Sequence, residues 1–284
     1  MSPSPLRLEH ETGRAVTIAA GDAVLFRYVY APGTQAGESP RPYAHPVNSL
    51  AGDRLSGFRP NDHPWHQGLS LTVTNLSGVN FWGGPTYRRE DGYRWRSDHG
   101  EQRHREWLEL SPSRLRHTLG WHACATGEAM LEETRELSIS TAAGSWSLEW
   151  ASRLVNATGR TLEFGDPESA GLPGSHYTGL QFRGARALLD DHGDAAIRLC
   201  SDGGHEGEKA VHGATGRWLE WHAQSDETLR RTLIRFENPS DPIRWFVRRG
   251  YPLAAFSLNR DPGLALAPGG AVDLRHRLTF MDVA

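Results

Sequence analysis

The fold is decided by three consecutive segments: RLRHTLGWHACA (114–125), AMLEETRELSIST (129–141) and SWSLEWASRLVN (145–156). Charged and apolar residues alternate along each of them, as in strands that pack on one face and meet water on the other. The intervening turns, ATGE and AAG, each contain a glycine, and a further turn, NATGR, leads into TLEF (161–164). The stretch from about Arg103 to Phe164 therefore predicts an antiparallel meander.

Similar period-two segments continue on both sides of this meander. Ala15–Ala20 and Ala23–Tyr30 are separated by Gly21-Asp22, a dipeptide typical of hairpin turns. Further strands are expected at 68–76, 178–183, 217–223, 229–236, 254–258 and 272–281. No segment keeps a helical period over three turns. Because long antiparallel strands in this number curl or split into two packed sheets, we predict an all-β fold, a large antiparallel β-sandwich of roughly 12–18 strands.

The strand pattern has no internal repeat and no linker, so residues 1–284 are expected to form a single β-sandwich domain. It is interrupted by site loops around 41–67, 80–99 and 165–177, where glycine and proline stand beside polar and aromatic residues. Such residues shape a loop, because proline fixes φ and glycine adopts conformations that other residues avoid. Shaped loops on a rigid scaffold are where functional sites are usually found.

Composition excludes several classes of function. The net charge of −3 gives no electrostatic reason to expect nucleic acid or an anionic membrane as a partner. Cys124 and Cys200 are too far apart in sequence to make a metal motif or a disulfide framework. No segment has the length of a signal peptide core or a transmembrane helix, so we expect a soluble, cytoplasmic protein. Sandwiches of this size often pair, which leaves a homodimer open.

The sharpest local cluster is Asp62-His63-Pro64-Trp65-His66. In a regular strand, residues three apart point to opposite faces, so both histidines can serve one site only if the chain turns here. The prolines make a turn plausible. Either histidine could then be a general acid or base, with Asp62 orienting it, and the competing interpretation is a pair of histidines bonded to backbone.

A metal site is the rival interpretation of the same region. His45, His63 and His66 could form a three-histidine site with an open position, as in catalytic zinc enzymes. Their spacing matches no established motif, so we expect no metal cofactor and keep a divalent metal as the alternative.

Aromatic residues around Asn80-Phe81-Trp82-Gly83-Gly84-Pro85-Thr86-Tyr87 suggest a pocket wall. Together with Trp65, the rings of Trp82 and Tyr87 could stack on the C–H face of a sugar, since indole and phenol rings combine an apolar face with a polar edge. Core packing is the competing interpretation, above all for Phe81.

Five further polar residues are candidates for substrate binding: Arg41, His45, Arg59, His176 and Arg183. The first three precede the histidine loop, and the others lie in GSHYTGLQFR (174–183), where a loop enters a strand. Histidines within strands (His117, His122, His222 and His276) are interpreted as structural.

A carboxylate is also needed for acid–base chemistry. Alternation in LEETRE places Glu133 and Arg135 on one strand face. A surface ion pair is one interpretation, and a catalytic base that faces the histidine loop is the other. Asp62 and Glu168 are the next candidates for the base.

Several motifs carry a resemblance to a known family: RPYAHPV, RPNDHPWHQGL, NFWGGPTY, GSHYTGLQFR, HGATGRWLEW and WFVRRGYPLAAF. Over nearly its whole length the chain resembles the bacterial family labelled "methane oxygenase PmoA". The resemblance implies a link to sugar utilisation, and the β-rich pattern is similar to the supersandwich of galactose mutarotases, which use a histidine acid and a glutamate base. A membrane-bound methane oxygenase is excluded by the absence of any segment able to span a bilayer.

The sequence thus favours a cytoplasmic carbohydrate-active enzyme with a small-molecule sugar or sugar derivative as its partner. It would act through His63 or His66 and a carboxylate, Glu133 or Asp62, without a cofactor. Two alternatives remain: a non-catalytic sugar-binding or regulatory module, and a metal-dependent oxygenase or hydrolase that uses the three histidines.

Overall fold

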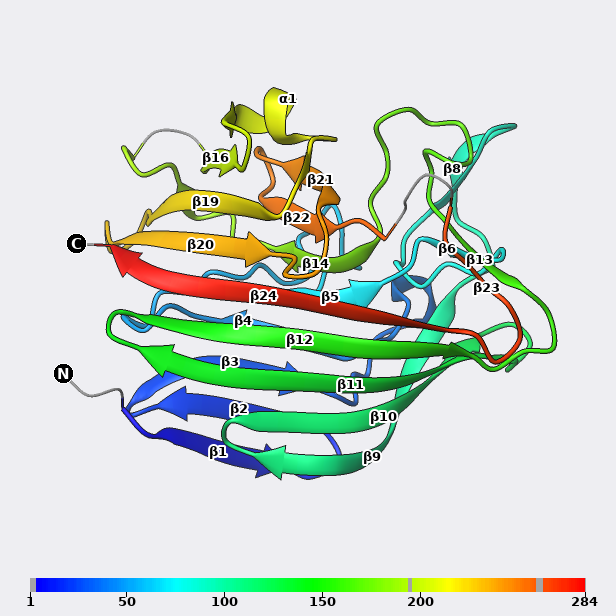
Figure 1. Cartoon of the computed structure of the whole chain (residues 1–284), viewed down its shortest axis with the longest axis horizontal. Helices are drawn as coiled ribbons and strands as arrows, with labels where there is room; N and C mark the ends of the chain where they lie inside the picture. The colour runs from blue at the N-terminus through cyan, green and yellow to red at the C-terminus, as the bar shows by residue number, and fades with distance from the viewer. Residues whose placement is uncertain (1–3, 194–195, 259–262, 284) are drawn as a thin grey trace.

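The computed structural model describes residues 4–193, 196–258 and 263–283 and places two large antiparallel sheets face to face (Figure 1). The nine-stranded sheet runs, in spatial order, β1 (Leu6–Glu11), β2 (Ala15–Ala20), β3 (Ala23–Val29), β4 (Tyr43–Val47), β5 (Leu69–Thr72), β14 (Gly179–Arg183), β22 (Leu253–Phe256), β21 (Ile243–Arg248) and β18 (Thr215–Gly216). The ten-stranded sheet runs β17 (His205–Glu206), β16 (Arg198–Ser201), β19 (Trp218–Ser225), β20 (Arg231–Glu237), β24 (Ala271–Val283), β12 (Ser145–Asn156), β11 (Ala129–Ala142), β10 (Arg114–Ala123) and β9 (Gly100–Ser111), with β15 (Leu188–Leu189) beside β19. The prediction of a large antiparallel β-sandwich is confirmed.

The remaining elements are short. A three-stranded sheet joins β23 (Ala265–Leu266), β13 (Leu162–Gly165) and β6 (Asn75–Leu76), and a small hairpin joins β7 (Thr86–Arg88) and β8 (Gly92–Arg94). The helices in the described residues are the 3-10 turn η1 (Ala36–Glu38) and α1 (Gly207–Val211). None of the described helices is long and apolar enough to cross a membrane.

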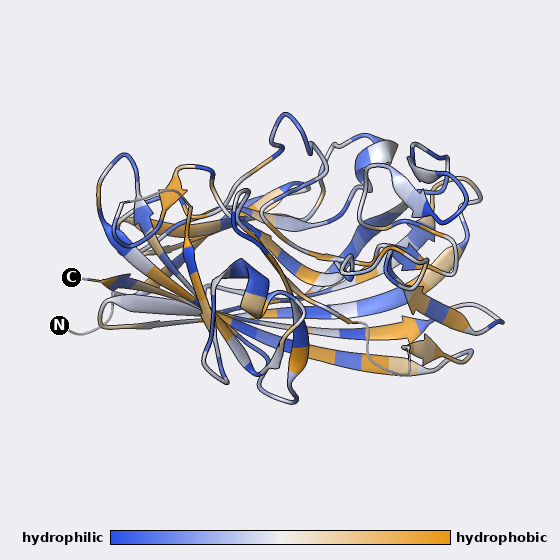
Figure 2. Ribbon diagram, turned by 90° about the horizontal axis from the view of Figure 1, so that it is seen from above, coloured by the Kyte–Doolittle hydropathy of each residue, from blue (hydrophilic) through white to orange (hydrophobic). Residues whose placement is uncertain are grey.

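The core lies between the two sheets, because alternate residues of each strand point inward. Figure 2 shows this alternation as orange and blue bands along the strands. Aromatic rings meet across the gap: Phe26 stacks on Trp146 with centroids 5.8 Å apart, and Phe182 meets Phe280 at 6.0 Å. All four side chains are buried. Burying such rings contributes about 1.5–3 kcal/mol each, which makes the interface the main source of stability.

The nine-stranded sheet is buried on its second face as well. Along β21 and β22, Trp245, Val247 and Ala254 join the core, whereas Phe246 and Leu253 alternate with them and belong to a second apolar cluster. The loops that carry Trp65, Trp82 and Tyr177 cover this outer face. The candidate site forms between the sheet and those loops.

The described residues form 24 strands, more than the 12–18 expected. Many of the additional strands have only two to four residues, which is too short to show an alternation of polar and apolar residues in the sequence. The expected segments 15–20 and 178–183 correspond to β2 and β14. The strands β1, β4, β16 and β21 were not expected. The expected site loop 80–99 contains the short strands β7 and β8.

Candidate functional site

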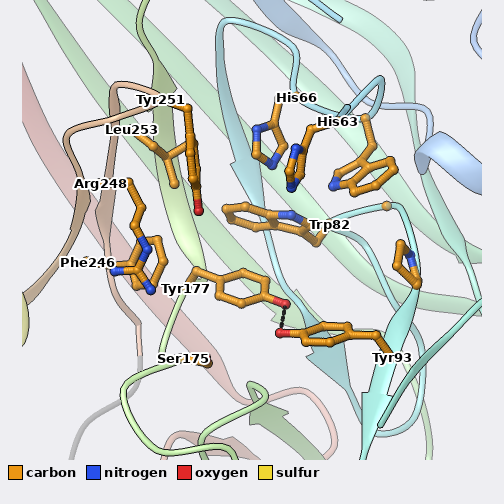
Figure 3. Close-up of a pocket in the computed structure, with 13 residues that line it drawn as sticks. His63, His66, Trp82, Tyr93, Ser175, Tyr177, Phe246, Arg248, Tyr251 and Leu253 are labelled. Atoms are coloured by element: carbon orange, nitrogen blue, oxygen red, sulfur yellow. Dashed lines mark hydrogen bonds between the residues drawn. The ribbon is translucent and has the colours of Figure 1, made fainter. Parts of the chain in front are cut away.

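A pocket of about 300 Å³ lies on the outer face of the nine-stranded sheet (Figure 3). Its wall draws on all three loop regions expected from the sequence and on a fourth segment, 246–253, from β21 and β22. The lining residues are His63, Trp65, His66, Trp82, Gly83, Pro85, Tyr93, Ser175, Tyr177, Phe246, Arg248, Tyr251 and Leu253.

Aromatic side chains dominate this wall. Trp82 packs against Tyr177 with ring centroids 4.8 Å apart, and Tyr177 packs against Phe246 at 5.4 Å. Trp65 and Tyr251 pack against the same apolar cluster. Apolar walls with a few fixed polar groups are typical of small-molecule sites. Flat rings with polar edges suit a ligand that has both C–H faces and hydroxyls.

The two histidines of the DHPWH motif meet at the pocket, because the chain turns twice between Pro60 and His66. His63 N donates to the Pro60 carbonyl and His66 N donates to the His63 carbonyl, each at 2.9 Å. The imidazole centroids are 4.8 Å apart, and His63 also stacks on Tyr251 at 5.6 Å with 19° between the planes. The chain therefore makes the turn that a shared site requires, and both histidine rings line one pocket.

The two imidazoles have different environments. The His63 side chain is 35% exposed, and its Nδ1 lies 3.3 Å from Asp62 Oδ2. Asp62 is itself held by Arg186 at 2.5 Å. His66 is only 3% exposed, and burial holds its pKa well below the usual value, so it is neutral near pH 7. Its Nδ1 has no hydrogen-bond partner among the described residues, which is unusual for a buried polar atom.

The opposite side of the pocket carries hydroxyls and one cation. Tyr93 Oη and Tyr177 Oη are 2.8 Å apart, the contact drawn in Figure 3. Burial raises the pKa of Tyr177 well above its usual value, so this phenol remains a hydrogen-bond donor. Arg248 Nη1 donates to His212 Nδ1 at 3.0 Å and to the Val247 carbonyl at 2.9 Å. The described lining contains no aspartate, glutamate or lysine.

Beneath the wall, Arg41 supports the loops instead of contacting the pocket. It is 1% exposed and donates to the carbonyls of Glu38, Ser39 and Trp65 at 2.7–2.9 Å. Burial lowers its pKa to about 9. Arg59 also lies outside the described lining and pairs with the Glu38 carboxylate at 2.7 Å. Both arginines were expected to bind substrate, and the structure places Arg41 on loop backbone and Arg59 on a carboxylate.

A glycine next to Trp65 fixes the indole against the loop. Gly84 has a φ of +72°, and a Cβ at this position would collide with the Trp65 ring. Asn80 Oδ1 accepts hydrogen bonds from the backbone N–H groups of Trp82 and Gly83 at 2.8 and 2.9 Å. The Gly-Gly turn therefore allows the loop that carries Trp82 to pack closely on the loop that carries Trp65.

Four other expected binding residues lie outside the described lining. His45 Nδ1 lies 2.8 Å from Ser56 Oγ, and burial lowers its pKa to about 4. His176 Nε2 donates to the Trp245 carbonyl at 3.2 Å, and Arg183 Nη1 donates to the Tyr251 carbonyl at 2.9 Å. Tyr87 packs on Tyr93 and lines a neighbouring hollow.

Glu133 is placed differently from both sequence interpretations. Its side chain and that of Arg135 are fully buried in the sandwich, with Arg135 Nε 2.7 Å from Glu133 Oε1. Trp121 Nε1 and Ser152 Oγ also donate to this carboxylate, at 2.7 and 2.6 Å. It is neither a surface pair nor a base at the histidine loop. The strand face was predicted correctly, but that face points into the core.

The three-histidine metal site does not form in the described part of the chain. His63 and His66 adjoin, but His45 is not grouped with them at the spacing of metal ligands. Its ring instead stacks on Phe58 at 4.9 Å. This geometry does not fit a metal held by these three residues.

Sequence reasoning missed the part of the wall made by Phe246, Arg248, Tyr251 and Leu253. The signal was present in WFVRRGYPLAAF (245–256), where an arginine pair and a tyrosine interrupt an apolar run. Tyr177 belongs to GSHYTGLQFR, whose tyrosine could be expected to complete a polar pocket, and it does line the pocket.

Comparisons with known proteins identify the family of the chain but no function for it. A family model described as a family of unknown function, DUF6807, matches residues 15–284. The name expected from the sequence motifs is not part of that description. No curated protein matches the chain.

Solved structures resemble the chain only distantly. A galactose mutarotase related enzyme from Lactobacillus acidophilus is 10% identical with a TM-score of 0.40, and each chain is 97% covered. A galactose mutarotase-like protein from Clostridium acetobutylicum is 11% identical with a TM-score of 0.35, with 100% of both chains covered. A polysaccharide lyase is 12% identical with a TM-score of 0.38, and this chain spans 33% of its length.

Proposed function

The chain belongs to the family of unknown function DUF6807, and on that premise we propose that its pocket binds a sugar or sugar derivative of about monosaccharide size and acts on it by acid–base chemistry. One observation carries the proposal: the Asp62–His63 pair stands beside the neutral His66 in a pocket of about 300 Å³ whose wall is largely aromatic. Stacking rings would hold the sugar face, and the imidazoles would reach its hydroxyls.

In this proposal His63 transfers the proton. Asp62 occupies the Nδ1 side of the ring, which leaves Nε2 for the substrate and orients the imidazole as a carboxylate does in other acid–base sites. A ring nitrogen of an imidazole can accept a proton and donate it again, so His63 can take a hydroxyl proton and return it. His66, which stays neutral, would hydrogen-bond the sugar from the pocket wall.

The other side of the pocket would set the orientation of the sugar. Tyr93 and Tyr177 offer hydroxyls, and Arg248 offers the positive charge of the wall. Arg248 Nη1 lies 3.9 Å from Glu208 Oε1, outside the described lining, so its charge is partly balanced and the wall suits both neutral and anionic sugars. Neutral hexoses and the corresponding uronic acids are therefore the first pair to compare.

A non-catalytic sugar-binding module is the second candidate. It is favoured by the missing carboxylate: the described lining holds no residue that could act as the second acid or base of a histidine–glutamate pair. If His63 and His66 cannot share both proton transfers, the pocket would bind sugar without turnover.

The test separates binding from turnover. Binding of hexoses, pentoses and uronic acids would be measured by tryptophan fluorescence and calorimetry, and anomerisation by NMR line shapes. Trp65→Ala should weaken binding roughly tenfold, because it removes apolar contact worth about 1–2 kcal/mol. Trp218→Ala, in β19 of the other sheet, is the matched control and should leave affinity unchanged.

His63→Gln distinguishes the two candidates. An enzyme would keep binding and lose anomerisation by roughly 100-fold or more, the usual contribution of a general acid–base group. Binding without turnover by the wild type would support the binding module. If none of these sugars binds, or if Trp65→Ala and Trp218→Ala behave alike, the pocket is not a sugar site.

A further inference from the structure

Three side chains able to bind a metal converge on the ten-stranded sheet, away from the pocket. Cys200 lies in β16, and Glu220 and His222 lie in β19, the strand hydrogen-bonded to it (Figure 1). Cys200 is directly opposite Glu220 in the register, and His222 is two residues further along the same strand. None of the three lines the pocket described above.

The sheet places these side chains on one face. Leu199 and Trp221, their neighbours in sequence, are fully buried in the core, so the alternating residues point outward. The His222 and Glu220 side chains are 24% and 14% exposed. The cluster is thus accessible to an ion but partly shielded from bulk water.

The spacing of the three ligand atoms matches one face of a tetrahedral metal site. Cys200 Sγ is 3.3 Å from His222 Nε2 and 3.9 Å from Glu220 Oε2, and the last two atoms are 3.5 Å apart. Tetrahedral zinc, with bonds of about 2.3 Å to sulfur and about 2.0–2.1 Å to nitrogen and oxygen, sets these separations at about 3.6, 3.6 and 3.4 Å. Each edge agrees within about 0.3 Å.

Neighbouring charges hold the ligands in the required orientation. Asp191 Oδ2 lies 4.0 Å from His222 Nδ1, on the side of the ring opposite to the ligand atom Nε2. Arg235 donates to Glu220 Oε1 at 2.7 Å, which leaves Oε2 for the ion. Arg198 in turn binds Asp191 at 2.8 Å. At 4.0 Å, Asp191 interacts with the imidazole through its charge and not through a hydrogen bond.

We propose that Cys200, Glu220 and His222 form a zinc-binding site, with water or an external ligand in the fourth position. Thiolate, imidazole and carboxylate together suit Zn²⁺, whereas Mg²⁺ and Ca²⁺ require oxygen ligands. The ion would join β16 to β19, and in turn stabilise the edge of the sheet where α1 packs. The site is independent of the sugar pocket and of its proposed chemistry.

The experiment measures metal bound to the full chain, purified without chelator or metal-affinity resin. Zinc is removed by chelator and restored by titration, with stoichiometry read by mass spectrometry and affinity by competition with a chromophoric chelator. The wild type should bind one zinc ion. With cobalt(II) in place of zinc, it should show a thiolate-to-metal charge-transfer band and intense visible bands of tetrahedral geometry.

Matched variants locate the site. Cys200→Ala and His222→Ala should weaken zinc binding by roughly 100-fold or more, since changes even one step removed from a ligand cost 10–100-fold. Cys124→Ala changes the chain's other cysteine, which is exposed, and should bind zinc as the wild type does. Circular dichroism of the metal-free proteins checks that each variant folds.

The proposal is overturned by any of three results: no thiolate band in the cobalt-loaded wild type, zinc retained by Cys200→Ala, or zinc lost equally in Cys124→Ala. The second result would assign the metal to surface histidines. The cobalt spectrum needs no variant, so a folding failure in one of them leaves the proposal testable.

Discussion

Replacing Glu133 by glutamine tests whether this residue stabilises the sandwich or serves catalysis. Gln keeps the shape of the side chain but removes its charge, and Arg135 then remains as a cation with a fully buried side chain. Four hydrogen bonds reach the carboxylate, two of them from the Arg135 guanidinium at 2.7 and 2.8 Å. A neutral amide cannot accept all of them, because its NH₂ group only donates.

The expected loss follows from the burial of both partners. Breaking a buried ion pair by removing one partner costs about 3–5 kcal/mol, because the other charge is left uncompensated in a medium that solvates it poorly. Tyr28 and Gln102 also accept hydrogen bonds from Arg135, at 3.0 and 2.9 Å. These contacts reduce the loss of stability, but neither side chain carries a negative charge that could replace the carboxylate. We therefore expect the Glu133→Gln variant to lose about 3–5 kcal/mol of unfolding free energy.

The assay is urea unfolding at neutral pH, followed by circular dichroism and tryptophan fluorescence. Glu136→Gln is the matched control: it lies on the solvated face of the same strand and pairs with Arg114, and its side chain is 25% exposed. It should cost less than about 1 kcal/mol. Arg135→Met completes a double-mutant cycle, in which the coupling between Glu133 and Arg135 should reach about 2–3 kcal/mol.

Two results would refute this reasoning. If Glu133→Gln unfolds at the same urea concentration as the wild type and abolishes turnover of a sugar that it still binds, the carboxylate acts in catalysis. Equal destabilisation by Glu133→Gln and Glu136→Gln would show that the buried pair contributes no more than a surface pair does.

Two further predictions concern the core and the pocket. Burial against Phe256 lowers the pKa of His276 to about 3, whereas the unfolded chain takes up this proton near pH 6.5, so acid favours unfolding. Between pH 7 and pH 5 this group should reduce the unfolding free energy by about 2 kcal/mol, and His276→Phe should remove that part of the pH dependence in urea titrations. Gly84→Ala should displace Trp65 and weaken sugar binding roughly tenfold, a loss of about 1.4 kcal/mol. Gly92→Ala, at a similar φ of +69° with open space around its Cβ, should leave the affinity unchanged, and equal affinities of the two alanine variants would count against Trp65 as a wall residue.

The strands most readily predicted are the long ones with one wet face, such as β11 and β12. β2 matches its expected segment because its alternation ends at the Gly21-Asp22 turn. β21 (IRWFVR) was missed because it is covered on both sides: Trp245 faces the sandwich core, and Phe246 faces the pocket. A strand buried on both faces loses the period-two signal, since no position needs to be polar. Burial on both faces is not sufficient to hide a strand, since β14 and β22 were expected although every residue in them is buried. In β21 the half-buried Arg244 and Arg248 also interrupt the apolar run.

The sequence predicted candidate site residues correctly where residues close in sequence are enough to place them in the site. The turns within residues 60–66 suffice to bring His63 and His66 together, and a loop of that composition indicates them. The role of a charged residue, by contrast, depends on which face of its strand is covered. Glu133 was placed on the correct face, but its period-two pattern is the same whether that face meets water, a ligand or the second sheet.

For the proposed zinc site, the sequence predicts the relative position of two of the three ligands. Glu220 and His222 stand at alternate positions of one strand, so the sequence alone places both on one face. The third ligand is set by the register between β16 and β19, which puts Cys200 opposite Glu220. A shift of one residue in that register would turn Cys200 to the core face and separate it from His222. The distance in sequence that spoke against a metal motif is therefore no obstacle in a sheet, where ligands from two strands meet through pairing rather than through spacing.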